Sequence, residues 1–130
     1  MDIPAEAQKY KVMDETRLTY VDNLEKLNYL AEHLSKQTEI AVDLEHHDHR
    51  TFLGITCLMQ ISSRDEDFIV DTIALKKHIG DALRGIFDDP NIVKVLHGAN
   101  SDVEWLQRDF GLYVVNLFDT YWAARTLGLP

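Results

Sequence analysis

Three alternating segments stand close together in the first half of the chain, and their succession constrains the fold more than any other feature. In residues 39–45, aliphatic side chains alternate with alanine and two acids, which is the period-two pattern of a strand with one buried face. Residues 55–62 and 67–72 are two further apolar segments of strand length, and the polar residues 63–66 between them are typical of a hairpin turn. The pattern predicts three consecutive strands, with acids near the end of the first.

Helices and single strands alternate along the rest of the chain. Leucines at three- and four-residue spacing predict a helix over residues 23–36, with Asp22 and Glu25 at capping-box spacing. The same reasoning predicts a helix from Leu75 that stops at Asp89-Pro90, a strand at 92–96, a helix at 100–109 ended by Gly111, a strand at 113–118 and a helix at 120–127.

This order of elements indicates an α/β fold with a mixed sheet flanked by helices. The three adjacent strands favour antiparallel pairing, and the strand–helix alternation after them favours parallel pairing. A ribonuclease-H-like arrangement fits this order. A doubly wound, flavodoxin-like sheet is the alternative, although it accommodates the hairpin of the second and third strands less well. We expect one domain, because the chain has 130 residues and no low-complexity linker.

The charge of the chain limits the kinds of function that it supports. It has 22 acidic and 13 basic residues and a net charge of −9. This balance disfavours a simple nucleic-acid-binding module, because such binding rests on Lys and Arg at phosphates. An enzyme that meets phosphate through carboxylate-bound cations is compatible with it. The single cysteine excludes an internal disulfide, and no apolar run reaches the roughly 18 residues of a membrane helix, so we expect a soluble intracellular protein without a membrane partner.

Asp43 and Glu45 lie two residues apart on the first predicted strand, so their carboxylates share a face roughly 7 Å apart along the backbone. Such a pair can converge on one cation, or it can mark a strand that runs out into solvent. Asp102 follows a glycine turn at the end of a later predicted strand. If the two strands are parallel neighbours, the three acids meet at one edge of the sheet. The structural alternative is helix capping by Asn100 or Ser101, with Asp102 near the helix dipole.

Other polar and aromatic residues surround these positions. Trp105 shares a helical face with Asp102, where it can stack on a base or pack in the core. The run His46-His47-Asp48-His49 invites a zinc-site interpretation, but neighbouring strand residues face opposite sides and the sequence offers no second ligand cluster. His46 alone is a candidate donor to substrate. Asp119 ends another predicted strand before a helix, where N-capping is its simplest role, so we leave it outside the site.

Two longer segments are recognisable as a whole. They are EIAVDLEHHDHRTFLGITCLMQIS at residues 39–62 and VKVLHGANSDVEWLQRDFGLYVVNLFDT at residues 93–120. Together they resemble the DEDD-type 3′-5′ exonuclease domain of the RNase D-like ribonuclease that is associated with the nuclear exosome. The resemblance runs from about residue 39 to residue 130, and it extends well beyond the acids themselves.

The resemblance implies a ribonuclease-H-like fold and a two-metal site that hydrolyses RNA from its 3′ end to nucleoside monophosphates. It makes Asp43 and Glu45 the first metal motif and places Asp102 in the second, so that all three are catalytic. Two Mg²⁺ ions, with Mn²⁺ as a substitute, suit a set of oxygen ligands.

The resemblance also implies a substrate and a cellular setting. It places His46, Asn100 and Trp105 against the substrate, which is an RNA with a free 3′ end. Subunits of the nuclear exosome become the expected partners, with RNA processing and decay as the process. The nucleus, and the nucleolus within it, becomes the expected location.

The sequence departs from the family at its far end. The family continues into a helix with a tyrosine and a fourth acidic ligand, and no Tyr-x-x-x-Asp follows Asp102 here. We therefore divide the chain into a lead, residues 1–22, and a partial exonuclease domain, residues 23–130. We expect it to be inactive or nearly so alone, with weakened metal binding. The alternative is a non-catalytic adaptor that keeps the fold and binds RNA or a protein. Surface left uncovered by the absent helices predicts self-association.

Overall fold

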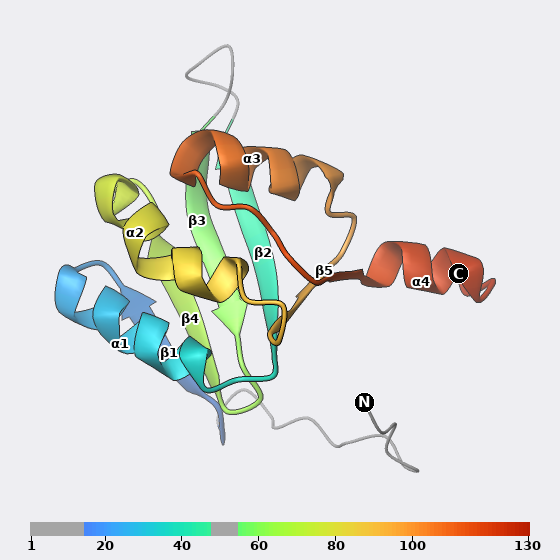
Figure 1. Cartoon of the computed structure of the whole chain (residues 1–130), viewed down its shortest axis with the longest axis horizontal. Helices are drawn as coiled ribbons and strands as arrows, with labels where there is room; N and C mark the ends of the chain where they lie inside the picture. Colours follow the sequence, from blue (N-terminus) through green and yellow to red (C-terminus); the bar gives the residue numbers. More distant parts are fainter. Residues whose placement is uncertain (1–14, 48–54) are drawn as a thin grey trace.

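The computed structural model describes residues 15–47 and 55–130, and six strands and four helices lie within these residues. In chain order they are β1 (Arg17–Val21), α1 (Leu24–Ser35), β2 (Glu39–His47), β3 (Ile55–Ser62), β4 (Glu66–Asp71), α2 (Lys76–Phe87), β5 (Val93–Leu96), α3 (Asn100–Phe110), β6 (Leu117–Asp119) and α4 (Thr120–Thr126) (Figure 1).

The six described strands form one mixed sheet in the order β1-β4-β3-β2-β5-β6. β2, β3 and β4 pair in antiparallel fashion, whereas β5 joins β2 and β6 joins β5 in parallel. This confirms the predicted α/β fold and excludes the doubly wound alternative, whose sheet is parallel. β1 pairs in parallel with β4 at the far edge. Part of the stretch 1–22, which the sequence set apart as a lead, thus belongs to the sheet.

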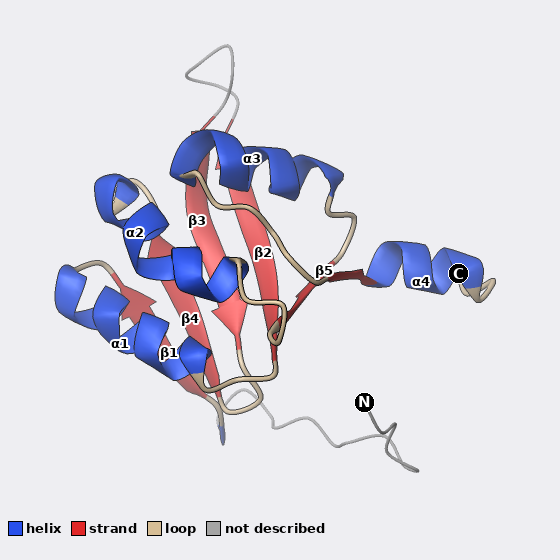
Figure 2. Ribbon diagram, in the orientation of Figure 1, coloured by secondary structure: helices blue, strands red, loops and turns tan. Residues whose placement is uncertain are grey.

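One face of the sheet is covered by α1, α2 and α3 (Figure 2). The alternation in β2 explains this placement, because Ile40, Val42 and Leu44 are buried beneath the helices while the residues between them are exposed. The helices contribute matching apolar stripes, such as Leu27 and Leu83, to the same core. The outer face of the sheet therefore presents the side chains of Ala41, Asp43 and Glu45.

The N-cap of the first helix lies one residue later than predicted. Asn23 has the extended backbone of an N-cap, and its side-chain oxygen accepts a hydrogen bond from Lys26 N at 2.9 Å. The predicted cap at Asp22 is therefore wrong. Asp22 instead forms an ion pair with Lys26 Nζ at 3.3 Å, four residues along the chain.

The strand predicted over residues 113–118 is wrong over most of its length, because β6 covers only its end. The preceding backbone is held in an irregular path. Val115 N donates to Phe87 O at 2.9 Å, and Val115 O accepts from the buried Lys94 Nζ at 3.0 Å. Asn116 has a φ of 63°, which a strand residue does not adopt. The apolar alternation in this segment therefore does not mark a strand. The segment is instead held in place by hydrogen bonds to α2 and β5.

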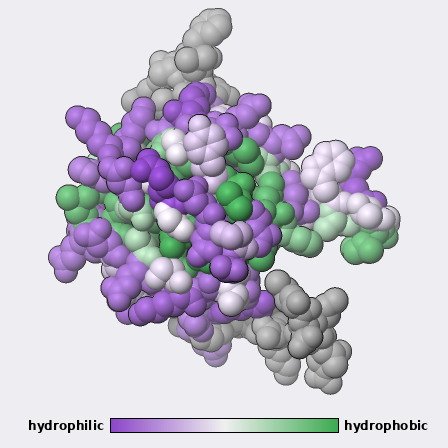
Figure 3. Space-filling model, viewed as in Figure 1, coloured by the Kyte–Doolittle hydropathy of each residue, from purple (hydrophilic) through white to green (hydrophobic). Residues whose placement is uncertain are grey.

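The last helix, α4, projects from the body of the molecule (Figure 1) and buries none of its residues. Large apolar side chains are exposed in this region, and Figure 3 shows hydrophobic residues at the projecting end. Their exposed fractions are 51% for Phe118, 51% for Trp122, 74% for Leu127 and 58% for Leu129. Within the described residues, no helix combines the length and the apolar character needed to cross a membrane.

Candidate active site

The first two predicted ligands lie on β2. Asp43 and Glu45 are both exposed on the outer face of the sheet. β5 runs parallel to β2 with Val95 opposite Ala41, so the carboxyl end of β5 lies next to the acidic end of β2. This confirms the predicted neighbourhood of the two strands. The chain then leaves β5 through Gly98, whose φ of 65° permits the tight turn into α3.

Asp102 lies in the first turn of α3, and only 7% of it is exposed. Burial, followed by the negative charges of Asp43, Asp119 and Glu45, raises the pKa of the Asp102 carboxyl to about 6. The turn thus brings Asp102 within electrostatic reach of both acids of β2. A buried carboxyl that faces other carboxylates is the kind of group that a cation stabilises.

The start of α3 differs from the predicted capping arrangement. Ala99 occupies the N-cap position, and no side chain caps the helix. Asn100 and Ser101 are the first two residues of the helix itself, so the capping role considered for them is wrong. The backbone of the turn finds its acceptor elsewhere in the chain.

That acceptor is Asp119, which sequence reasoning left outside the site. Asp119 Oδ1 accepts from Gly98 N at 2.9 Å, and Oδ2 accepts from Ala99 N at 2.8 Å. Oδ1 also accepts from Tyr121 N at 2.9 Å, which confirms the predicted N-cap of α4. The hydrogen bond from Ala99, together with those from Gly98 and Tyr121, lowers the pKa of Asp119. One carboxylate therefore holds the turn that delivers Asp102 to the site.

The predicted substrate contacts are arranged around a pair of rings. His46 stacks on Trp105 with ring centroids 3.8 Å apart and an angle of 3° between the planes. Asn100 is exposed at the first position of α3, on the turn that precedes Asp102. Each ring covers one face of the other, and an outward face of the pair is the kind of aromatic surface on which nucleic-acid bases stack.

Sequence reasoning missed three residues behind this pair of rings. Arg108 Nη2 lies 3.4 Å from His46 Nε2. The Arg108 side chain donates a hydrogen bond to the Asp109 carboxylate, which also accepts one from the Thr56 hydroxyl. No sequence signal singles them out, because an arginine and an aspartate late in a helix are typical of a solvated surface. They belong to the site through contacts across more than 50 residues of sequence.

The acids have the chemistry that a divalent metal needs, although their geometry is not that of a bound ion. Within residues 15–47 and 55–130, no three His, Cys, Asp or Glu side chains are arranged as a metal-binding group. Asp43, Glu45 and Asp102 nevertheless offer only oxygen donors, which Mg²⁺ and Mn²⁺ prefer. The side chain of His47 and residues Asp48 and His49 lie outside the described part, so the zinc interpretation of that run stays untested.

A mixed sheet of this order, flanked by helices, defines a ribonuclease-H-like α/β domain. The sequence profile described as 3′-5′ exonuclease matches residues 18–130, and the chain belongs to this family. Exonuclease domains of this family are metal-dependent.

Two curated relatives match nearly the whole chain and are much longer than it. Human exosome complex component 10 is 56% identical over 122 residues, which cover 94% of this chain and 14% of the human protein. The exosome complex exonuclease RRP6 of Saccharomyces cerevisiae is 52% identical over 120 residues, which cover 92% of this chain and 16% of the yeast protein. The chain therefore spans a small part of the length of these relatives.

Two solved structures share the fold. The catalytic core of RRP6 from Trypanosoma brucei superposes with a TM-score of 0.90 at 52% identity, covering 93% of this chain and 33% of that one. RNase D from Escherichia coli, described as an exoribonuclease involved in structured RNA processing, superposes with a TM-score of 0.78 at 25% identity. It covers 88% of this chain, which spans 30% of RNase D.

Proposed function

We propose that the chain is the part of a metal-dependent 3′-5′ exoribonuclease that holds the metals and the terminal nucleotide, in an enzyme that releases nucleoside monophosphates. The observation that carries the proposal is the buried carboxyl of Asp102 beside the charges of Asp43 and Glu45. Like charges at the end of a strand cost stability, and a cation bound by oxygen is the usual compensation. The family membership and the names of the relatives support RNA as the substrate.

In this proposal Asp43, Glu45 and Asp102 hold two Mg²⁺ ions, for which Mn²⁺ can substitute. Ions bound in such a site activate water and stabilise the departing 3′ oxygen. The chain's own contribution is positioning. β2 fixes two carboxylates on a rigid strand, and the Asp119-bonded turn fixes the third.

The substrate in this proposal is an RNA with a free 3′ end, and His46, Asn100 and Trp105 engage its terminal nucleotide. The stacked rings of His46 and Trp105 supply the aromatic surface, and Asn100 supplies an exposed amide beside the acids. Aromatic stacking tolerates any base, so such a site removes nucleotides with little sequence preference.

We infer association with the exosome and a nuclear, in particular nucleolar, location from the same relatives. Human exosome complex component 10 is named as a component of that complex, and the yeast relative is named as its exonuclease. Co-purification of the tagged protein with exosome subunits tests the first inference, and imaging of the tagged protein tests the second.

Metal binding is the direct test of the proposed site. Mn²⁺ titration followed by electron paramagnetic resonance should reveal uptake by the chain, and Asp43→Asn should weaken it by tenfold or more, about 1.4 kcal/mol. Asp81→Asn is the matched control, because Asp81 is an exposed acid of α2 that accepts a hydrogen bond from Arg84. Equal effects of the two substitutions would refute the site, and absence of any uptake would favour the non-catalytic adaptor.

The RNA assay tests the substrate. In the presence of Mn²⁺, the longer enzyme that this proposal assigns the chain to should shorten a labelled linear RNA with a 3′ hydroxyl stepwise, and it should leave a circular RNA of the same sequence intact. Trimming that survives Asp43→Asn, or cleavage of the circle, would contradict the proposal. The expectation that these 130 residues alone trim weakly or not at all stays a prediction, and the same assay decides it.

We also propose that the chain associates with itself through the region of β6 and α4. This region exposes Phe118, Trp122 and Leu127 together, and such apolar surface favours association. Sedimentation velocity at rising concentration should reveal dimers, and Leu127→Ser should reduce them. Leu18→Ser, at an exposed leucine on the opposite edge of the sheet, should leave them unchanged. Monomers at every concentration would refute this inference.

A further inference from the structure

We propose that Arg108, oriented by Asp109, is a positioning residue that holds the His46 ring flat on Trp105. The inference rests on the proposed function in one respect, which is that these two rings receive the terminal nucleotide. It adds residues that lie behind the rings and do not themselves touch the nucleotide. The chain of contacts runs from the sheet through Thr56, Asp109 and Arg108 to His46.

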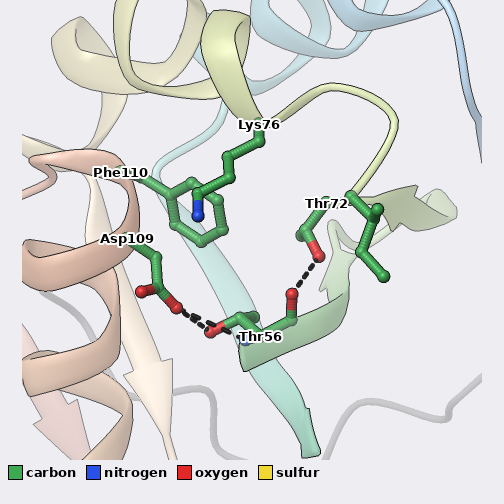
Figure 4. A pocket seen from close by; sticks show the side chains of 6 residues that line it. Thr56, Thr72, Lys76, Asp109 and Phe110 are labelled. Atoms are coloured by element: carbon green, nitrogen blue, oxygen red, sulfur yellow. Dashed lines mark hydrogen bonds between the residues drawn. The ribbon is translucent and has the colours of Figure 1, made fainter. Parts of the chain in front are cut away.

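Asp109 is the fixed point of this chain of contacts. Its side chain is only 12% exposed, and its carboxylate accepts from Arg108 Nε at 2.7 Å and from Arg108 Nη2 at 3.1 Å. It also accepts from Thr56 Oγ1 at 2.6 Å and from Thr56 N at 3.3 Å (Figure 4). Burial alone would raise the pKa of Asp109, but the hydrogen bonds from Arg108 and Thr56 outweigh it and lower the pKa. The carboxylate is therefore held in its charged form.

Thr56 reaches Asp109 because the sheet is irregular at this point. The register of β2 and β3 shifts between Glu45 and His46, so that Glu45 lies opposite Leu58 whereas His46 lies opposite Thr56. Without this bulge, strict alternation would place Thr56 on the outer face together with Leu58. Instead Thr56 is buried and turned toward α3. Because of the bulge, Thr56, which lies opposite His46, reaches the Asp109 carboxylate that orients Arg108.

The same contact is braced from a second side. Thr56 O accepts a hydrogen bond from Thr72 Oγ1 at 2.8 Å, which ties the start of β3 to the end of β4. A cavity of about 110 Å³ adjoins the Asp109–Thr56 contact, with Lys76 and Phe110 on its other walls (Figure 4). The hydrogen bonds on the sheet side leave Asp109 little freedom, so the guanidinium that it binds is fixed in both position and plane.

Arg108, fixed in this way, contacts the ring of His46 and restricts its orientation. A guanidinium group has only donors, so His46 Nε2 is the acceptor in the 3.4 Å contact. The contact fixes one edge of the imidazole while its face rests on Trp105. Side chains ordered before the ligand arrives lose less freedom on binding. Arg108 therefore strengthens nucleotide binding through His46.

The test reads the ring pair directly. In a Trp122→Phe background, Trp105 is the remaining tryptophan, and its emission reports on the stacked imidazole. His46→Ala sets the full scale of the change. Arg108→Met should reproduce most of it, whereas Arg84→Met, at an ion-paired arginine of the neighbouring helix, should leave the emission unchanged. In the His46→Ala background, Arg108→Met should add little, because its effect runs through His46.

Nucleotide binding supplies the second readout. Adenosine monophosphate titrated in the presence of Mn²⁺ should bind about two- to tenfold more weakly to Arg108→Met, which is the range expected for one hydrogen bond, while Mn²⁺ affinity stays unchanged. Arg108→Lys should behave like Arg108→Met, since one ammonium cannot serve both Asp109 and His46. Full additivity with His46→Ala, or tighter nucleotide binding, would overturn the positioning role. If the parent binds no nucleotide, the proposed function fails, and the emission of Trp105 still decides the positioning.

Discussion

Asp102→Asn should stabilise the metal-free protein above pH 6. The pKa of the Asp102 carboxyl is raised from 3.8 to about 6, first by burial and then by neighbouring carboxylates. Well below pH 3.8 the group is protonated in both the folded and the unfolded chain and costs nothing. Between pH 3.8 and about 6 the unfolded chain releases this proton while the folded protein retains it, so stability falls with rising pH until the folded group also ionises. The stability lost is at most about 3 kcal/mol, because one pKa unit corresponds to about 1.36 kcal/mol.

Asparagine keeps the shape of the side chain and removes this charge. The difference in unfolding free energy between Asp102→Asn and the parent should be small at pH 4, should grow as the pH rises to about 6 and should then level off at about 1–3 kcal/mol. Urea unfolding in the presence of a chelator, at five pH values from 4 to 8, measures this difference. Asp81→Asn, at an exposed acid, should give a flat profile. A flat profile for Asp102→Asn, or a variant less stable than the parent at pH 8, would refute the reasoning.

Two further predictions concern close contacts elsewhere in the fold. Gly80→Ala should destabilise the protein by about 1–3 kcal/mol, because a Cβ at this position would collide with the backbone carbonyl of Phe110. Gly85→Ala, which meets open space on the same helix, should instead stabilise it by about 0.5–1 kcal/mol. Thermal melts that rank the two variants equally would contradict this. Asp119→Ala should lower the melting temperature at neutral pH. The difference from the parent should shrink as the pH falls below the ordinary carboxyl range, because Asp119, whose pKa is lowered in the fold, stabilises the protein only while it is charged. A difference that persists in acid would contradict this.

The arrangement of the sheet was predictable from the sequence because each strand carries its own pattern. The alternation in residues 39–45 assigns one face to the core and the other to Asp43 and Glu45, and the structure keeps that assignment. The polar turn between β3 and β4 likewise fixes an antiparallel pair, closed by Ser63 N donating to Glu66 O at 2.9 Å. Such features depend on neighbours in the chain.

What could not be predicted depends on contacts distant in sequence. Most of the alternating residues 113–118 do not form a strand. The buried Lys94 Nζ donates a hydrogen bond to the backbone carbonyl of Val115, which a regular strand would have paired with a neighbouring strand. Thr56 would face outward by alternation, and only a bulge turns it to Asp109. The second role of Asp119 also escapes local reasoning, since its N-cap role alone explains the residue type.

The hydrogen bonds of Asp119 have a mechanical consequence. The same carboxylate receives the amides of Gly98 and Ala99 ahead of α3 and the amide of Tyr121 in α4. Asp119 thereby joins the start of α4, a helix without buried residues, to the turn that carries Asp102. A shift of the start of α4 should therefore also move the turn that carries Asp102, because one carboxylate accepts hydrogen bonds from both. Although none of its residues is buried, α4 is thus linked by hydrogen bonds to the turn that places Asp102 beside the other acids.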